Sequence, residues 1–187
     1  MLEVEMKFPV ADFAEVEHRL AGWRARADGP REDVDHYLNA PDRDFARTDE
    51  ALRLRRIGET NVLTYKGPKR DAHTKTRTEV EVPLRGGAEA AALTVELLHH
   101  LGYRSVREVR KRRAVFHLER EGFALEVCLD DVAGLGRFVE LEIQAPEEGL
   151  DGAKAVLRRV ADELGLSQSE RRSYLELLLS RAQGVGP

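Results

Sequence analysis

The sequence has few of the features that mark secreted, membrane-spanning or zinc-binding proteins. Only one of its 187 residues is a cysteine, Cys128, so no intrachain disulfide can form, which fits a reducing compartment. No apolar run approaches the ~20 residues of a membrane span. The first residues become acidic at once, without the basic and apolar regions of a signal peptide. No group of Cys and His residues has zinc-ligand spacing. We therefore expect a cytoplasmic protein.

A strong excess of charge of either sign is also missing. The formal net charge is −4, with 34% charged and 42% hydrophobic residues. This balance does not indicate a nucleic-acid or membrane partner. The length suits a single domain with a sizeable core.

Apolar and polar residues alternate with a period of two in much of the chain, which predicts strands. Eight such segments are expected, at 2–9, 34–38, 51–57, 61–66, 75–83, 108–118, 123–130 and 137–144. Apolar stripes with helical spacing predict four helices, at 11–23, 88–101, 152–164 and 172–182. We expect each stripe to pack on the core. The fold class is therefore α+β, mainly β.

The polar faces of these strands are almost wholly charged. In the first strand, for example, Glu3, Glu5 and Lys7 share one face. One interpretation is an antiparallel sheet with one face in water. The near absence of Ser, Thr and Asn from these faces favours another, in which helices cover the apolar side and the charges line a barrel. We expect an eight-stranded antiparallel closed barrel with flanking helices.

The charges that would line this barrel have both signs. The basic groups suit a chain of phosphates, because a guanidinium group can donate two parallel hydrogen bonds to phosphate oxygens. The acidic groups suit Mg²⁺ or Mn²⁺, which prefer oxygen ligands. The basic candidates are Lys7, Arg53, Arg55, Lys66, Arg77, Lys111 and Arg113, and the acidic candidates are Glu3, Glu5, Glu79, Glu81, Glu126, Asp130, Glu140 and Glu142.

Several motifs in fixed order resemble the CYTH superfamily, most closely its class IV adenylyl cyclases. The segment 3–7, EVEMK, resembles the family's ExExK motif, and 63–69, LTYKGPK, its TYKGP element. Further matches are DHYL at 35–38, RTEVE at 77–81, KRR at 111–113, LGRFVELE at 135–142 and the pair SY at 173–174. Leu38 departs from the pattern, since cyclase-like members usually have an aromatic residue there. The similarity extends from residue 2 to about residue 179.

The resemblance implies a single CYTH domain over 1–183, followed by a disordered tail at 184–187. It also implies a tunnel that holds a triphosphate. Phosphates would contact Lys7, Arg53, Arg55, Lys66, Arg77, Lys111 and Arg113. A divalent metal, Mg²⁺ or Mn²⁺, would bind among Glu3, Glu5, Asp130, Glu140 and Glu142. The catalytic candidates are Glu5, Lys7, Lys111, Arg113 and Asp130.

Three functions remain open at this stage. The first is a class IV adenylyl cyclase, which converts ATP to cyclic AMP and pyrophosphate. The second is a triphosphatase acting on inorganic, thiamine or nucleoside triphosphate, and the third is a polyphosphate- or nucleotide-binding module without turnover. The motifs favour the cyclase. The partner would be ATP or another triphosphate, and the sequence leaves a homodimer open. The basic segment 67–76 is either a solvated loop or a lid over phosphates.

Overall fold

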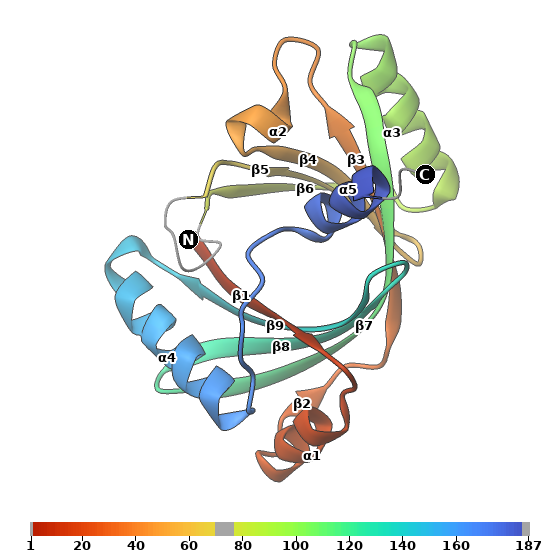
Figure 1. Ribbon diagram of the computed structural model, residues 1–187. Coiled ribbons are helices and arrows are strands. Elements are labelled where there is room, and N and C mark those ends of the chain that lie inside the picture. The colour runs from red at the N-terminus through yellow and green to blue at the C-terminus, as the bar shows by residue number, and fades with distance from the viewer. Residues whose placement is uncertain (1, 70–76, 185–187) are drawn as a thin grey trace.

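The computed structural model describes residues 2–69 and 77–184, and it shows one curled antiparallel sheet flanked by helices (Figure 1). The strands are β1 (Leu2–Val10), β2 (Arg26–Ala27), β3 (Arg31–Asn39), β4 (Ala51–Ile57), β5 (Thr60–Lys66), β6 (Glu79–Leu84), β7 (Arg104–Arg120), β8 (Phe123–Val132) and β9 (Gly136–Ala145). The helices are α1 (Ala14–Gly22), α2 (Phe45–Thr48), α3 (Ala88–His100), α4 (Leu150–Glu163) and α5 (Tyr174–Gly184), with a 3₁₀ turn at Glu147–Gly149. The expected mainly-β class is confirmed.

The expected closed barrel is wrong, because the sheet is a curled half-barrel that stays open. Its strand order is β1-β9-β8-β7-β3-β4-β5-β6, and β2 pairs with β7. Within residues 2–69 and 77–184, the end strands β1 and β6 are not paired, and an isolated bridge between Glu3 and Arg77 is the one link between the two edges. The chain near Glu170 takes part of the remaining edge, since its N–H donates to the Lys7 carbonyl oxygen over 2.7 Å. An open and a closed sheet have the same alternation, so the sequence pattern could not distinguish them.

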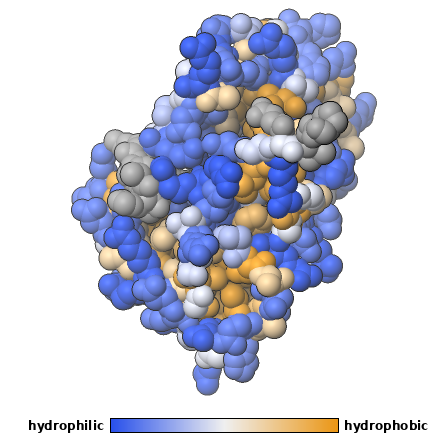
Figure 2. All heavy atoms as spheres, in the orientation of Figure 1, coloured by the Kyte–Doolittle hydropathy of each residue, from blue (hydrophilic) through white to orange (hydrophobic). Residues whose placement is uncertain are grey.

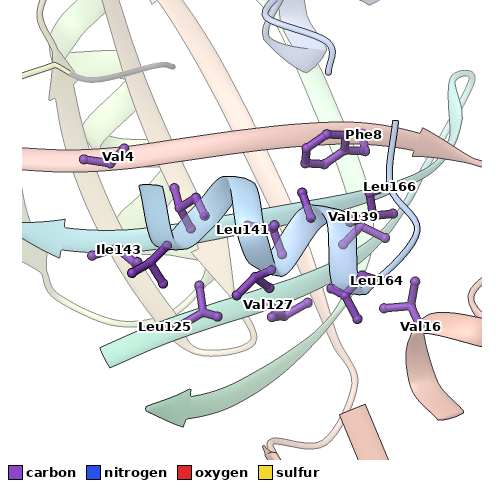
Figure 3. Close-up of a cluster of buried hydrophobic side chains, with 14 of the residues drawn as sticks. Val4, Phe8, Val16, Leu125, Val127, Val139, Leu141, Ile143, Leu164 and Leu166 are labelled. Atoms are coloured by element: carbon purple, nitrogen blue, oxygen red, sulfur yellow. The ribbon is translucent and has the colours of Figure 1, made fainter. Parts of the chain in front are cut away.

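The main hydrophobic core lies on the convex side of β1, β9 and β8, under α4 and α1. Buried residues of α4 recur at helical spacing, as Val156, Leu157 and Val160 show. They pack against outward-facing residues of the strands such as Leu141 and Val127 (Figure 3). Each such side chain contributes about 1.5–3 kcal/mol on burial. This core fixes the apolar side of the sheet outward and therefore turns the charged side inward.

The expected packing of α3 on the core is wrong. None of its residues is buried, and Leu97 and Leu101 are 59% and 60% exposed. The helix lies against the outer side of β3, β4 and β7, where His36 and Arg56 line the space between helix and sheet. Apolar as well as polar residues line the sheet side of this space, with Val34 and Leu54 beside His36, and the apolar side chains of Leu93 and Leu97 on α3 remain largely exposed.

Other differences concern the bounds of elements. β7 is 17 residues long and begins before the expected strand, while β2 and α2 were not expected. Residues 70–76 of the basic segment and residues 185–187 of the expected tail lie outside the described residues. Within the described chain, no helix is long and apolar enough to cross a membrane. The face drawn in Figure 2 is mostly hydrophilic, with apolar residues in patches between charged ones.

Candidate functional site

The concave side of the sheet holds a charged cavity of about 900 Å³ that is open to solvent. Eleven of the twelve predicted site residues line it, and they come from both ends of the sheet. These are Glu3, Glu5, Lys7, Arg53, Arg55, Lys66, Arg77, Lys111, Arg113, Glu140 and Glu142. The twelfth, Asp130, is fully buried and does not line the cavity.

Carboxylates gather on β1 and β9, which form one wall of the cavity. Glu5 lies directly opposite Glu142 in the antiparallel ladder, and Glu140 lies opposite Lys7. Burial and the neighbouring carboxylates Glu3, Glu140 and Glu5 raise the pKa of Glu142 to about 8, although Arg113 opposes the shift. Burial, with Glu79 and Glu5, likewise raises the pKa of Glu3 to about 7 against the pull of Lys66.

This wall has the donor set that a hard divalent cation requires. Like charges placed directly opposite each other destabilise a sheet, so the facing carboxylates of Glu5 and Glu142 cost free energy while no cation lies between them. Mg²⁺ and Mn²⁺ prefer oxygen ligands of this kind. The residues present therefore fit such an ion, and Glu3, Glu5, Glu140 and Glu142 are the residues that would hold it.

The raised pKa of Glu142 leads to a prediction for the metal-free protein. The pKa rises from 4.5 to about 8 on folding, so between these values the folded chain binds a proton that the unfolded chain has released. Stability should then fall as pH rises, by up to about 1.4 kcal/mol per pH unit from this group. Urea unfolding between pH 5 and 8 should show a shallower decline for Glu142→Gln than for the wild type. Equal slopes would contradict the assignment.

Basic side chains from β4, β5 and the segment before β6 form the opposite wall. Arg55 makes a bidentate pair with Asp35, with its Nε 2.6 Å from Oδ1 and its Nη2 2.7 Å from Oδ2. Burial alone would raise the pKa of Asp35, but the guanidinium groups of Arg55 and Arg53 hold it well below its usual value. Asp35 is therefore ionised and keeps both arginines in place.

Two of these arginines have a buried guanidinium nitrogen without a hydrogen bond. Among the described residues, the buried Nε atoms of Arg53 and Arg77 make no hydrogen bond, although Arg77 Nε lies 3.3 Å from a Glu79 oxygen. Buried polar atoms are seldom left without a partner. An anionic ligand in the cavity would supply acceptors for both.

Asp130 sits behind the cavity at the centre of a buried network. Arg113 Nε donates to its Oδ1 over 2.6 Å and Lys111 Nζ to its Oδ2 over 3.2 Å. The hydroxyl of Tyr174 also donates to Oδ2, over 2.9 Å. Lys7 Nζ lies 4.1 Å from the centre of the Tyr174 ring. With its oxygens taken up in this way, Asp130 is placed to orient Lys111 and Arg113 toward the cavity.

Several lining residues were not among the predicted site residues. Arg31 and Gln144 contribute to the cavity, as do Asp35 and Tyr37. Asp35 and Tyr37 share the inward face of β3, and the alternation along 33–37 could have identified them. Arg31 was missed because β3 begins three residues earlier than expected. Ser173 directly precedes α5 and Tyr174 begins it, and both line the cavity. In the sequence, only the SY motif had indicated them.

A second, more apolar pocket of about 800 Å³ adjoins the charged cavity. Tyr37, Lys66, Arg77 and Ser173 line both. Its other walls come from α2 and its flanks and from α5, and they include the apolar residues Leu38, Phe45, Ala46, Ala51, Val106, Leu175 and Leu179. Polar side chains line it as well, among them the carboxylates of Asp44, Asp49, Glu50 and Glu176. A pocket that combines apolar walls with polar groups is typical of small-molecule sites.

Comparison with known proteins identifies what the chain resembles. A family model described as the CYTH domain matches residues 1–174. A protein of Methanocaldococcus jannaschii named "Putative adenylate cyclase" is 35% identical over 182 residues, which is 95% of this chain and 98% of that protein. The adenylate cyclase CyaB of Aeromonas hydrophila is 29% identical over 181 residues, covering 94% of this chain and 87% of the relative.

Solved structures show the same fold. The PH1819 protein of Pyrococcus horikoshii is similar with a TM-score of 0.84 and 36% identity, over 96% of this chain and 99% of that one. The HpAC1 protein of Hippeastrum, which has a dominant triphosphatase activity, is similar with a TM-score of 0.66 and 16% identity, over 100% and 97% of the two chains. The half-barrel is thus a known arrangement.

Proposed function

Because the chain belongs to the CYTH family, we propose that it is a metal-dependent adenylyl cyclase that converts ATP to cyclic AMP and pyrophosphate. The observation that carries this proposal is the junction of two sites. A cavity with basic and acidic walls opens into a more apolar pocket, and Tyr37, Lys66 and Arg77 line both. The cavity suits a triphosphate, and the adjoining pocket suits a nucleobase.

The triphosphate would lie along the basic wall. Arg53 and Lys66 reach the cavity from the neighbouring strands β4 and β5, and Arg77 reaches it from the segment before β6. The set is completed by Lys7, Arg55, Lys111 and Arg113. The unused Nε donors of Arg53 and Arg77 favour an anionic ligand. Hydrogen bonds from charged donors to an anion contribute about 1.5–3 kcal/mol each.

The metal ion would lie by the acidic wall, held by Glu3, Glu5, Glu140 and Glu142. Bound there, Mg²⁺ or Mn²⁺ would activate the attacking oxygen and neutralise charge on the phosphates. Asp130 contributes indirectly, through its contacts to Lys111 and Arg113. This replaces the direct metal role that the motif had implied for it.

In the proposed reaction the ribose 3′-oxygen attacks the α-phosphorus and the bond to pyrophosphate breaks. Lys111 and Arg113 are placed to stabilise the charge that develops on the phosphate oxygens. Lys7 and Lys66 would hold the departing pyrophosphate. A carboxylate of the acidic wall would accept the proton of the 3′-hydroxyl. In this proposal, the four basic side chains named above would act from the positions in which the strands hold them.

A triphosphatase is the second candidate, because the same cavity could hold a triphosphate without a base. The similarity to the Hippeastrum protein, which has a dominant triphosphatase activity, keeps this candidate open. In that case water would attack a terminal phosphorus, and the apolar pocket would not contribute.

Product analysis distinguishes the two reactions. Purified protein incubated with ATP and Mn²⁺ should release cyclic AMP and pyrophosphate in equal amounts, as measured by chromatography. ADP and phosphate alone, or turnover of tripolyphosphate alone, would contradict the cyclase. Binding of ATP without any turnover would indicate a binding module.

Filling the apolar pocket should separate nucleotide from tripolyphosphate binding. Ala46 lines this pocket but not the charged cavity, so Ala46→Phe should raise the KM for ATP by about tenfold or more through steric exclusion of the base. That change corresponds to ~1.4 kcal/mol of binding free energy. The affinity for tripolyphosphate, measured by calorimetry, should stay the same. Equal losses for both ligands would place the base elsewhere.

A further inference from the structure

The exposed apolar side chains of this protein are concentrated in one segment of the chain. Across residues 2–69 and 77–184, the large apolar residues that are exposed are Val80, Val82, Leu93, Leu97, Leu101 and Val106. Three of them form a row along the outer side of α3, because Leu93, Leu97 and Leu101 follow one another at intervals of four residues. These leucines are 57%, 59% and 60% exposed. A row of half-exposed leucines on one helix marks an interaction surface.

The side of α3 that faces the sheet is apolar as well. Ala91 and Val95 of the helix line the space between helix and sheet, together with Val34 and Leu54 of the strands. A helix that is apolar on all sides is normally buried on all sides. In a single copy of this chain, however, none of the residues of α3 is buried. The composition of α3 is therefore that of a helix with a second packing partner.

The helix α4 shows how this fold treats a helix whose outer side stays in water. Its sheet side is buried, as Val156 and Val160 show. Its outer side carries the exposed charged residues Arg158, Arg159 and Asp162. On α3, leucines stand where α4 has these charges, so the two helices differ in what their outer sides contact.

The charges at the two ends of α3 indicate which partner covers it. Glu89 lies in the first turn, and His99 and His100 lie in the last turn, with Arg104 shortly after the helix. If two copies place their α3 helices side by side in opposite directions, Glu89 of each copy lies next to the basic end of the other. The helix dipoles favour the same arrangement, because opposite partial charges become neighbours. A two-fold axis generates it, and the surface is therefore complementary to itself.

We propose that two copies of this chain form a symmetric dimer in which their α3 helices pack in antiparallel directions through Leu93, Leu97 and Leu101. The helix has 13 residues and is thus about 20 Å long. A pair of such helices buries less than the ~800 Å² per partner of a standard interface, so the dimer is weak and reversible. Because α3 lies on the outer side of the half-barrel (Figure 1), the cavity stays open in both copies. The dimer does not depend on the proposed function.

Sedimentation velocity of the full chain over a range of concentrations tests the dimer without ligand or metal. Wild type should pass reversibly from monomer to dimer, with a dissociation constant in the micromolar range. Leu97→Glu should raise this constant by about 100-fold or more, because the charge enters the centre of the interface from both copies. The control Arg158→Glu places the same side chain on the exposed outer side of α4 and should match the wild type.

Charge reversal tests the direction of the two helices. Glu89→Arg and Arg104→Glu should each raise the dissociation constant by about tenfold, because like charges then meet at both ends of the helix pair. The double variant with both changes in one chain should return to the wild-type constant, since the two charges are only exchanged. In a parallel pair, Glu89 would lie beside its own copy, and Glu89→Arg would not weaken the dimer.

The proposal fails if the wild type stays a monomer at every concentration, which would also be the result if another protein covers α3. It fails as well if Leu97→Glu dimerises like the wild type, because the interface would then lie elsewhere. Circular dichroism shows whether Leu97→Glu is folded. If it is not, the charge variants decide, and unchanged dissociation constants in both single variants would overturn the antiparallel dimer. Because turnover is not measured, these results are independent of whether ATP is the substrate.

Discussion

Replacing Arg113 by methionine should lower the free energy of unfolding by about 3–5 kcal/mol, the range seen when one partner of a buried ion pair is removed. Arg113 holds the fully buried carboxylate of Asp130 through two hydrogen bonds, of 2.6 and 2.5 Å, and also pairs with Glu140. Among the described residues, the substitution leaves Lys111 and Tyr174 as the hydrogen-bonding partners of the Asp130 side chain. Urea unfolding at pH 7 measures the loss.

Two further variants show whether the loss of stability comes from the unpaired buried carboxylate of Asp130. Arg137→Met removes an exposed pair with Asp131, 3.7 Å apart on the outer face, and should cost less than about 1 kcal/mol. Combining Arg113→Met with Asp130→Asn should recover part of the loss, because the second change removes the unpaired carboxylate. Equal losses for Arg113→Met and Arg137→Met would show that the buried network does not stabilise the fold.

Replacing Glu5 by glutamine should lower kcat by about 100–1,000-fold, the effect of removing one electrostatic contact to the transition state. Glu5 is buried in the acidic wall directly opposite Glu142, and it is one of the four carboxylates of the proposed metal site. The amide lacks the negative charge that holds a divalent ion. Initial rates with ATP at several Mn²⁺ concentrations measure the effect, and the loss should be smaller at high Mn²⁺.

The control is the same chemical change on the outer face. Glu32 is exposed on β3 and points away from the cavity, so Glu32→Gln should leave the rate within about twofold. The unfolding free energy of Glu5→Gln should not fall, because the variant relieves repulsion with Glu142. A Glu5→Gln protein with wild-type kcat would remove Glu5 from the proposed metal set.

The side on which each charge lies could be predicted from the sequence, and the closure of the sheet could not. Alternation along β1 placed Glu3, Glu5 and Lys7 on one face, and all three line the cavity. The same alternation holds in an open sheet, so the expected closed barrel failed at its edges, where among the described residues β1 does not pair with β6 and a single bridge joins Glu3 to Arg77. The chain near Glu170 lies along part of the free edge, where its N–H donates to the Lys7 carbonyl oxygen. Because these two residues are far apart in the sequence, no local pattern predicts this contact.

The structure also separates residues that the motifs had grouped. Asp130 was assigned to the metal with Glu140 and Glu142, but its carboxylate lies behind the cavity and binds Lys111 and Arg113. Both kinds of carboxylate sit on inward faces of neighbouring strands, so spacing alone does not distinguish them. Tyr174 distinguishes them, because its hydroxyl donates a hydrogen bond to Asp130 and completes the buried network. This tyrosine lies more than forty residues from Asp130 in the sequence.

Calorimetric titration with a non-hydrolysable ATP analogue and Mn²⁺ measures binding to the concave face apart from the reaction. We expect saturable binding of one molecule per chain. Arg53→Met should weaken this binding by about 10–100-fold through loss of a charged donor to phosphate, whereas Arg56→Met, which changes the outer face of the same strand beside α3, should leave it unchanged. No binding by the wild type, or equal losses in the two variants, would contradict a triphosphate site on the concave face.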